Sequence, residues 1–115
     1  MLANTHRFHG HGSLRYVYKN GNVIRSHLIT IKTTKNKRRS HSRFAVVISK
    51  KVHKSAVGRN RMRRRIYEII RAELPKFDPA HDVAVMVFSS EVLFLESEEL
   101  RKTITVLFSR ADLYK

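Results

Sequence analysis

The chain of 115 residues is 42% hydrophobic and 29% charged, proportions typical of one folded domain rather than of a disordered chain. It has no cysteine, which excludes a disulfide scaffold, a cysteine-ligated zinc module and thiol catalysis, and its longest apolar runs (44–48 and 83–88) are too short to span a membrane. Its 24 Lys and Arg against 9 Asp and Glu give a formal net charge of +15, which indicates a polyanionic partner, with nucleic acid ahead of an anionic membrane surface.

The N-terminal residues predict an irregular arm followed by a short helix. Residues 1–12 carry three histidines and lack the apolar stretch of a signal peptide, so we expect a flexible, basic arm on a cytoplasmic protein. Ser13 can cap a helix over 14–19, and the turn residues 20–22 end it.

Three extended segments follow the first helix. A short one is expected at 23–25, and the β-branched, partly alternating run 27–33 predicts a clearer strand. Residues 34–42 read as a basic polar loop. The nearly continuous apolar run 44–49 then predicts a strand that is buried on both faces.

The second half predicts a long helix, a core strand and a final helix. Ser55 can cap a helix that runs to Leu74 and is stopped by Pro75, and residues 82–89 form the strand. The final helix is expected over 97–110, with glutamates in its first turn. The order α-β-β-β-α-β-α predicts one α+β domain over 1–115, a sandwich of helices on a mixed sheet.

Charge is distributed very unevenly along the chain. Residues 1–71 hold 19 basic residues and a single acid, Glu68, whereas residues 72–115 hold 5 basic and 8 acidic residues. We therefore expect the first part to contact the polyanion and the second part to act as scaffold.

The helix predicted over 55–74 carries the densest basic cluster. At 100° per residue, its Met and Ile side chains form one apolar stripe that is suited to pack against the sheet. So many arginines with one acid would repel one another on a free helix, which favours an anion bound on the face opposite the stripe. Guanidinium groups suit forked phosphate contacts and base stacking. The residues on that face are Asn60, Arg64, Tyr67 and Arg71.

A motif runs into this helix. The segment 49–68, SKKVHKSAVGRNRMRRRIYE, closely resembles the signature of the protein subunit of bacterial ribonuclease P. The likeness covers essentially the whole chain, from the short aromatic first helix to the closing residues 107–108 and 113–115. It implies the fold of the second domain of ribosomal protein S5, with a left-handed β-α-β crossover through the central helix.

The resemblance also implies roles for individual residues. It places Arg59, Asn60, Arg63 and Arg64 against the catalytic RNA, and it assigns Lys50, Lys51 and Lys54 to the basic approach to that helix. The family usually has Arg at the position of Tyr67, so a stacking contact is expected there in place of a phosphate contact.

In this family a central cleft holds the single-stranded 5′ leader of precursor tRNA. Tyr18 matches an aromatic position of that cleft, and Leu14 stands where Phe is more usual. Phe44 is assigned to the same cleft, although an aromatic at the head of an apolar strand is also typical of a core residue.

We expect no catalytic residue and no metal site in the protein itself. Residues 1–67 contain no carboxylate, so the basic part lacks ligands for a catalytic metal ion. The resemblance implies that the catalytic RNA carries out the hydrolysis with Mg²⁺ held by RNA and substrate. The protein is then a monomeric subunit of an endoribonuclease that removes 5′ leaders from precursor tRNA.

Two alternatives from other classes remain open. A small basic ribosomal protein would have the same size and charge. A self-sufficient RNase would use His6, His9 or His11 for acid–base chemistry, and the same histidines are weak candidates for metal binding.

Overall fold

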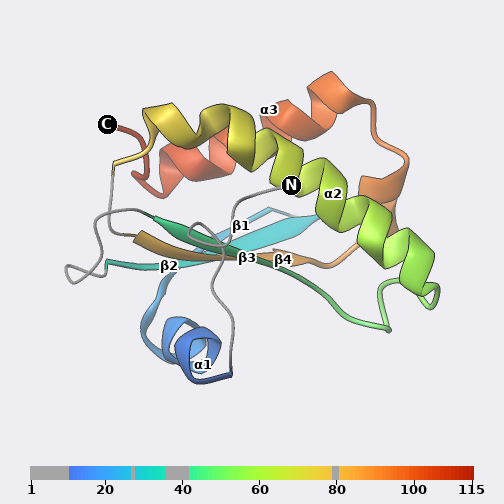
Figure 1. The fold of residues 1–115 in the computed structure, drawn as a ribbon, viewed down its shortest axis with the longest axis horizontal. Coiled ribbons are helices and arrows are strands. Elements are labelled where there is room, and N and C mark those ends of the chain that lie inside the picture. The colour runs from blue at the N-terminus through green and yellow to red at the C-terminus, as the bar shows by residue number, and fades with distance from the viewer. Residues whose placement is uncertain (1–10, 27, 36–41, 79–80) are drawn as a thin grey trace.

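The helices and strands follow one another in the predicted order (Figure 1). The computed structural model describes residues 11–26, 28–35, 42–78 and 81–115. The elements are α1 (His11–Asn20), β1 (Asn22–Arg25), β2 (Ile29–Lys35), β3 (Arg43–Ile48), α2 (Ala56–Glu73), the 3-10 turn η2 (Leu74–Lys76), β4 (His81–Val87), the 3-10 turn η3 (Ser90–Leu93) and α3 (Ser97–Arg110).

Element boundaries agree best where a cap or a strong period marks them. The bounds of α3 are those predicted, and Ser55 caps α2, its hydroxyl accepting a hydrogen bond from the Gly58 N–H. Helix α1 begins at His11, so Ser13 lies within its first turn and the prediction that it is the N-cap was wrong; a serine can occupy either position. Strand β2 ends at Lys35, two residues beyond the predicted end, because pairing with β4 continues to that point.

The four described strands form one mixed sheet in the order β1-β2-β4-β3. Neighbours are antiparallel except β3 and β4, which are parallel and are connected through α2. Strand β4 is therefore central, and the register pairs Val85 with both Ile31 of β2 and Val46 of β3. Paired residues point to the same face of a sheet, so this register fixes which side chains share a face.

The two faces of the sheet are covered differently. Helices α2 and α3 lie over one face and α1 alone lies on the other, toward one end of the strands (Figure 1). The main core is between the sheet and the helix pair, and it includes three contacting aromatic rings, those of Phe44, Phe77 and Phe108. A small second cluster joins Val17 of α1 to Ala84 of β4.

Strand β3 is buried on one face only. Phe44, Val46 and Ile48 are buried under α2, whereas Ala45 and Val47 are half-buried on the α1 side. The prediction that this strand is buried on both faces was therefore wrong, because α1 covers only part of its side of the sheet (Figure 1).

Candidate nucleic-acid interface

Helix α2 separates an apolar side from a basic one. Met62, Ile66 and Ile70 have no exposed surface and pack on the sheet. On the far side, the side chains are solvent-exposed, and we call this surface the basic face of α2: Asn60, Arg61, Arg64 and Arg71. The structure thus confirms the exposure of three of the four residues predicted for that side, Asn60, Arg64 and Arg71.

Tyr67 does not belong to the basic face. Only 8% of its surface is exposed, and its hydroxyl accepts a hydrogen bond of 3.3 Å from the backbone N–H of Val46. Strand β3 is at the edge of the described sheet, and α2 packs on it, so the long tyrosine side chain reaches a backbone donor of the edge strand. The predicted stacking role of Tyr67 was wrong, because the buried side of α2 is wider than its isoleucine stripe.

Arg59 shapes the loop that precedes α2. Its Nη1 donates to the backbone oxygens of His53, at 2.7 Å, and Lys54, at 2.9 Å, and the side chain is half-buried. The side chains of Lys50, Lys51 and Lys54 are exposed on this loop. Arg59 therefore positions the basic approach to α2.

His53 and Gly58 contact each other at the same loop, and no motif in the sequence indicated this contact. His53 Nδ1 accepts a hydrogen bond from the Ser55 N–H at 3.2 Å. A Cβ atom on Gly58 would lie 2.3 Å from Cε1 of that imidazole, so only glycine admits the ring at this distance. The imidazole is thus packed against the first turn of α2.

Asn60 and Arg63 are joined on the surface. Arg63 Nη1 donates to Asn60 Oδ1 at 2.9 Å, across one turn of the helix. Because this bond occupies the amide oxygen, the NH₂ group of Asn60 is oriented as the donor toward a ligand. The pair offers guanidinium and amide donors side by side.

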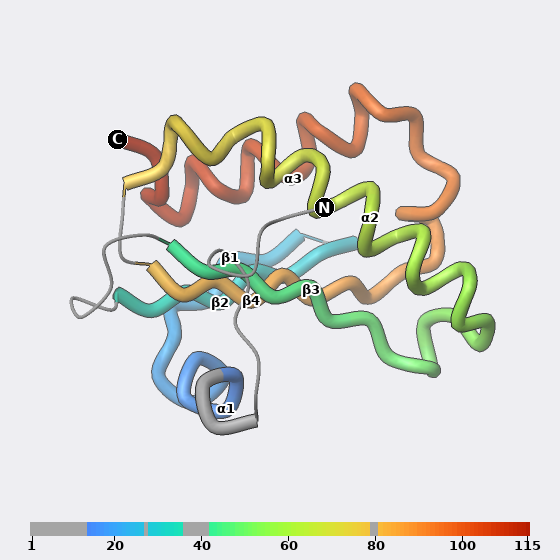
Figure 2. The backbone as a smooth tube through the Cα atoms, in the orientation of Figure 1, coloured from blue at the N-terminus to red at the C-terminus, as the bar shows by residue number. Residues whose placement is uncertain are grey.

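Arg65 binds the protein's own backbone rather than being exposed like Arg61 and Arg64. Its guanidinium donates to the backbone oxygens of Val92, at 2.7 Å, and Leu93, at 2.9 Å, and also to that of Leu95. It therefore ties the connection between β4 and α3 to α2, and Figure 2 shows this connection running beside the helix. Nothing in the sequence indicated these partners, which lie 27 to 30 residues away.

The α1 face of the sheet carries a second set of side chains. Helix α1 buries Val17 on this face, and Leu14 and Tyr18 beside it are half-buried. Lys32 Nζ donates to the Tyr18 backbone oxygen at 3.3 Å and lies 5.4 Å from the centre of the Tyr18 ring. Burial raises the pKa of the Tyr18 hydroxyl, so the ring is neutral and lies next to a cation.

Phe44 is not part of this second set. It pairs with Val83, on the face under α2 and α3, and it has no exposed surface. Its assignment to the leader cleft was therefore wrong, because alternation along β3 directs it away from α1. Pairing instead places Lys32, Val47 and Met86 on the α1 face, and Phe88, next in the same alternation, is 59% exposed.

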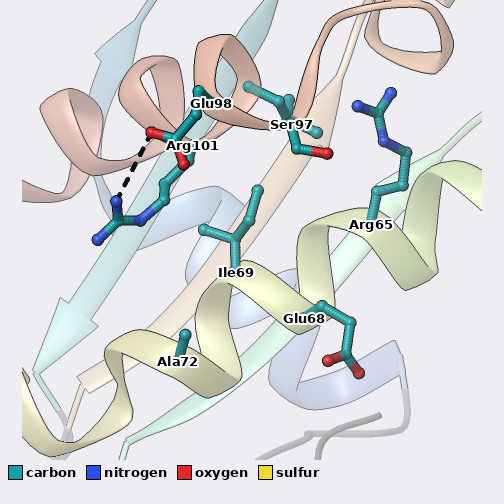
Figure 3. Close-up of a pocket in the computed structure, with 8 residues that line it drawn as sticks. Arg65, Glu68, Ile69, Ala72, Ser97, Glu98 and Arg101 are labelled. Carbon is teal, nitrogen blue, oxygen red and sulfur yellow. Dashed lines mark ion pairs between the residues drawn. The ribbon is translucent and has the colours of Figure 1, made fainter.

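A pocket of about 360 Å³ lies between α2 and α3 (Figure 3). Ile69, Ala72 and Leu100 give it apolar walls, and carboxylates of Glu68 and Glu98 are at its rim. Figure 3 shows Arg101 directed to Glu98, at 3.9 Å, so this arginine is partly neutralised. The carboxylates make the pocket a poor site for phosphate, and it does not extend the basic face.

The described residues contain no group of three or more His, Asp or Glu side chains arranged to hold a metal ion. His6 and His9 lie outside the described part of the chain, and His11 is described only as the first residue of α1. No helix within the described ranges has both the length and the apolar character needed to cross a membrane.

Comparisons with known proteins agree on one family. The family model described as Ribonuclease P matches residues 2–112. The ribonuclease P protein component of Synechocystis sp. is 29% identical over 112 residues, which cover 97% of this chain and 90% of the relative. That of Pseudanabaena sp. is 31% identical over 87 residues, covering 76% of this chain and 75% of the relative.

Solved structures show the same fold. The RNase P protein of Staphylococcus aureus superimposes with a TM-score of 0.85 at 21% identity, over 96% of this chain and 98% of that one. The RNase P protein of Thermotoga maritima gives 0.81 at 20% identity, over 90% and 96%. With the family model spanning nearly the whole sequence, the chain belongs to the ribonuclease P protein family.

Proposed function

We propose that this chain is the protein subunit of a ribonucleoprotein endonuclease that removes 5′ leaders from precursor tRNA, and that it acts as a monomer in that particle. The observation that carries the proposal is the basic face of α2, continued by the lysines of the preceding loop and built on a helix whose other side is fixed in the core. Family membership supports ribonuclease P RNA as the RNA that the basic face would bind.

The catalytic RNA is the proposed partner of the basic face. Arg64 and Arg71 are two turns apart on one exposed side of α2, a spacing of about 10 Å that lets them reach separate phosphates. Asn60 adds an oriented amide donor, suited to a base edge or a 2′-hydroxyl. Because Arg59 binds the loop carbonyls, the backbone that carries Lys54 is held in place before RNA binds, which lowers the entropic cost of binding.

The α1 face of the sheet is the proposed site of the single-stranded leader. Tyr18 and Leu14 provide the edge of α1, and Val47 and Met86 provide half-buried apolar surface on the neighbouring strands. Lys32 beside the Tyr18 ring supplies a cation for a leader phosphate next to a ring suited to base stacking. This arrangement favours precursor over mature tRNA, which has no leader.

In this proposal the hydrolysis takes place in the RNA. Mg²⁺ bound by the catalytic RNA and the substrate would supply the activated water and stabilise the leaving oxygen. The protein's part is electrostatic: its arginines and lysines lower the repulsion between two polyanions, so the substrate binds at a lower Mg²⁺ concentration.

The test is cleavage of precursor tRNA by a bacterial ribonuclease P RNA at low Mg²⁺, with and without the protein. We expect cleavage at the mature 5′ end only when both are present, and no cleavage by the protein alone. Arg64→Ala should weaken binding of the catalytic RNA. Lys102→Ala, which removes one exposed charge from α3, is the matched control and should leave it unchanged.

Tyr18→Ala tests the leader site separately. It should reduce the affinity for precursor tRNA and leave that for mature tRNA unchanged. If the protein binds RNA but restores cleavage with none of several catalytic RNAs, the subunit assignment is wrong, and a small ribosomal protein becomes the better explanation of its charge.

A further inference from the structure

Phe94 is an exposed aromatic ring that the proposed function does not use. It follows η3, and 78% of its surface is exposed, more than that of any other large hydrophobic residue among those described. Neighbouring Val92, in contrast, is fully buried and anchors the turn in the core. The ring itself therefore contributes little to the packing of the fold.

The backbone on both sides of Phe94 is held in place. Arg65 binds the carbonyl oxygens of Leu93 and Leu95, which flank Phe94, and it does so from α2 (Figure 3 shows Arg65 at the edge of the α2–α3 pocket). The Phe94 N–H donates to the Glu91 oxygen at 2.9 Å, which closes the turn. An exposed ring on a fixed backbone loses little conformational freedom when it binds a ligand.

The surroundings of Phe94 favour a neutral, flat ligand next to phosphates. Arg61 precedes Arg65 by one turn on the same side of α2, about 6 Å along the helix, and it is exposed. Glu91 and Glu96, both exposed, flank the ring along the chain and disfavour a phosphate at the ring itself. A nucleobase on Phe94, with the adjoining phosphate on Arg61, fits both conditions.

We propose that Phe94 is a stacking platform for an unpaired base of the RNA that binds the basic face of α2. The proposal rests on the proposed function, since the bound RNA is the catalytic RNA. It extends the interface from α2 to the β4–α3 connection, in the acidic half of the chain. Arg65 is then a positioning residue, because it holds the platform without touching the RNA.

The chain contains no tryptophan, so Phe94→Trp creates a unique fluorescent reporter on the platform. Stacking of a base on the indole should quench its emission when ribonuclease P RNA is added. Val106→Trp is the matched control, at an exposed site of α3. Equal responses of the two reporters would overturn the proposal.

Affinity gives a second measure. Phe94→Leu keeps an apolar side chain but removes the aromatic face, and we expect its affinity for ribonuclease P RNA to fall about 10-fold, whereas Phe94→Tyr should retain it. Val106→Ala should have no effect. Unchanged affinity of Phe94→Leu, or a change in its oligomeric state in place of RNA affinity, would show that the ring serves another purpose.

Different results would contradict the proposed function and the Phe94 platform. If the wild-type protein binds neither ribonuclease P RNA nor precursor tRNA specifically, the proposed function is wrong. The platform is still tested in that case with a mixed-sequence RNA oligonucleotide, which should quench Phe94→Trp when single-stranded but not when fully paired. Quenching by neither form would refute the platform itself.

Discussion

At the scale of single residues, side chains of one type serve different purposes on α2. Arg64 is exposed, Arg59 binds loop carbonyls and Arg65 binds the β4–α3 connection. Tyr67 differs from all of them, because it satisfies a backbone donor of the edge strand β3. Position in the motif therefore does not by itself identify an RNA contact. A side chain that binds the protein's own backbone has a structural role, even when its neighbours in the motif are exposed.

Tyr67→Phe tests this distinction. It removes only the hydroxyl that accepts from the Val46 N–H, so a buried donor is left without its partner. We expect the free energy of unfolding, measured by urea denaturation, to fall by about 1–2 kcal/mol. Affinity for the catalytic RNA should stay the same. A variant of normal stability and weakened RNA binding would instead return Tyr67 to the interface.

At the scale of elements, the sequence predicts most helices and strands and their order. It predicts less well which side of each element faces the core. Periodicity locates α2 and α3, and the Ser55 cap marks the start of α2, since both signals are local. Two features depend on packing between segments that are distant in the sequence. One is the face of β3 on which Phe44 lies, and the other is the burial of Tyr67 on α2. The basic face was predictable because an exposed arginine cluster needs no tertiary partner, whereas the bonds of Arg65 exist only in the folded chain.

Arg65→Met tests the link between α2 and the β4–α3 connection. Methionine keeps an apolar stem but loses the hydrogen bonds to Val92, Leu93 and Leu95. We expect a loss of about 2 kcal/mol in the free energy of unfolding. Arg61→Met, at an exposed position, should lower RNA affinity with little change in stability. Equal stabilities of the two variants in thermal and urea unfolding would contradict the anchoring role.

At the scale of the whole molecule, the two halves of the chain differ in charge but share one sheet. Residues 1–71 hold 19 of the 24 basic residues, whereas β4 and α3, which complete the core, belong to the half with 8 of the 9 acids. Because the core joins the halves, the acidic part presents the basic part in a fixed geometry. Long-range attraction to RNA and rigid placement of its contacts thus come from different parts of one domain.

The salt dependence of the RNA-binding constant K should show how many phosphates the basic residues neutralise. If about six phosphates are neutralised, log K should fall against log salt concentration with a slope of roughly −4. Arg64→Ala should make the slope shallower by about 0.7, and Lys102→Ala should leave it unchanged. Filter binding or fluorescence anisotropy over a KCl series measures this. A slope close to zero would mean that the basic face is not where RNA binds.

The central place of β4 has a consequence for synthesis on the ribosome. Strand β4 is the only described strand that pairs with both β2 and β3, and it is the last of them to be translated. A nascent chain that ends before residue 81 therefore has no bridge between the β1–β2 hairpin and the β3–α2 unit. The two proposed RNA sites acquire their relative positions only after residues 81–87 leave the exit tunnel, so a prematurely terminated chain would be highly cationic and would lack a fixed geometry between them.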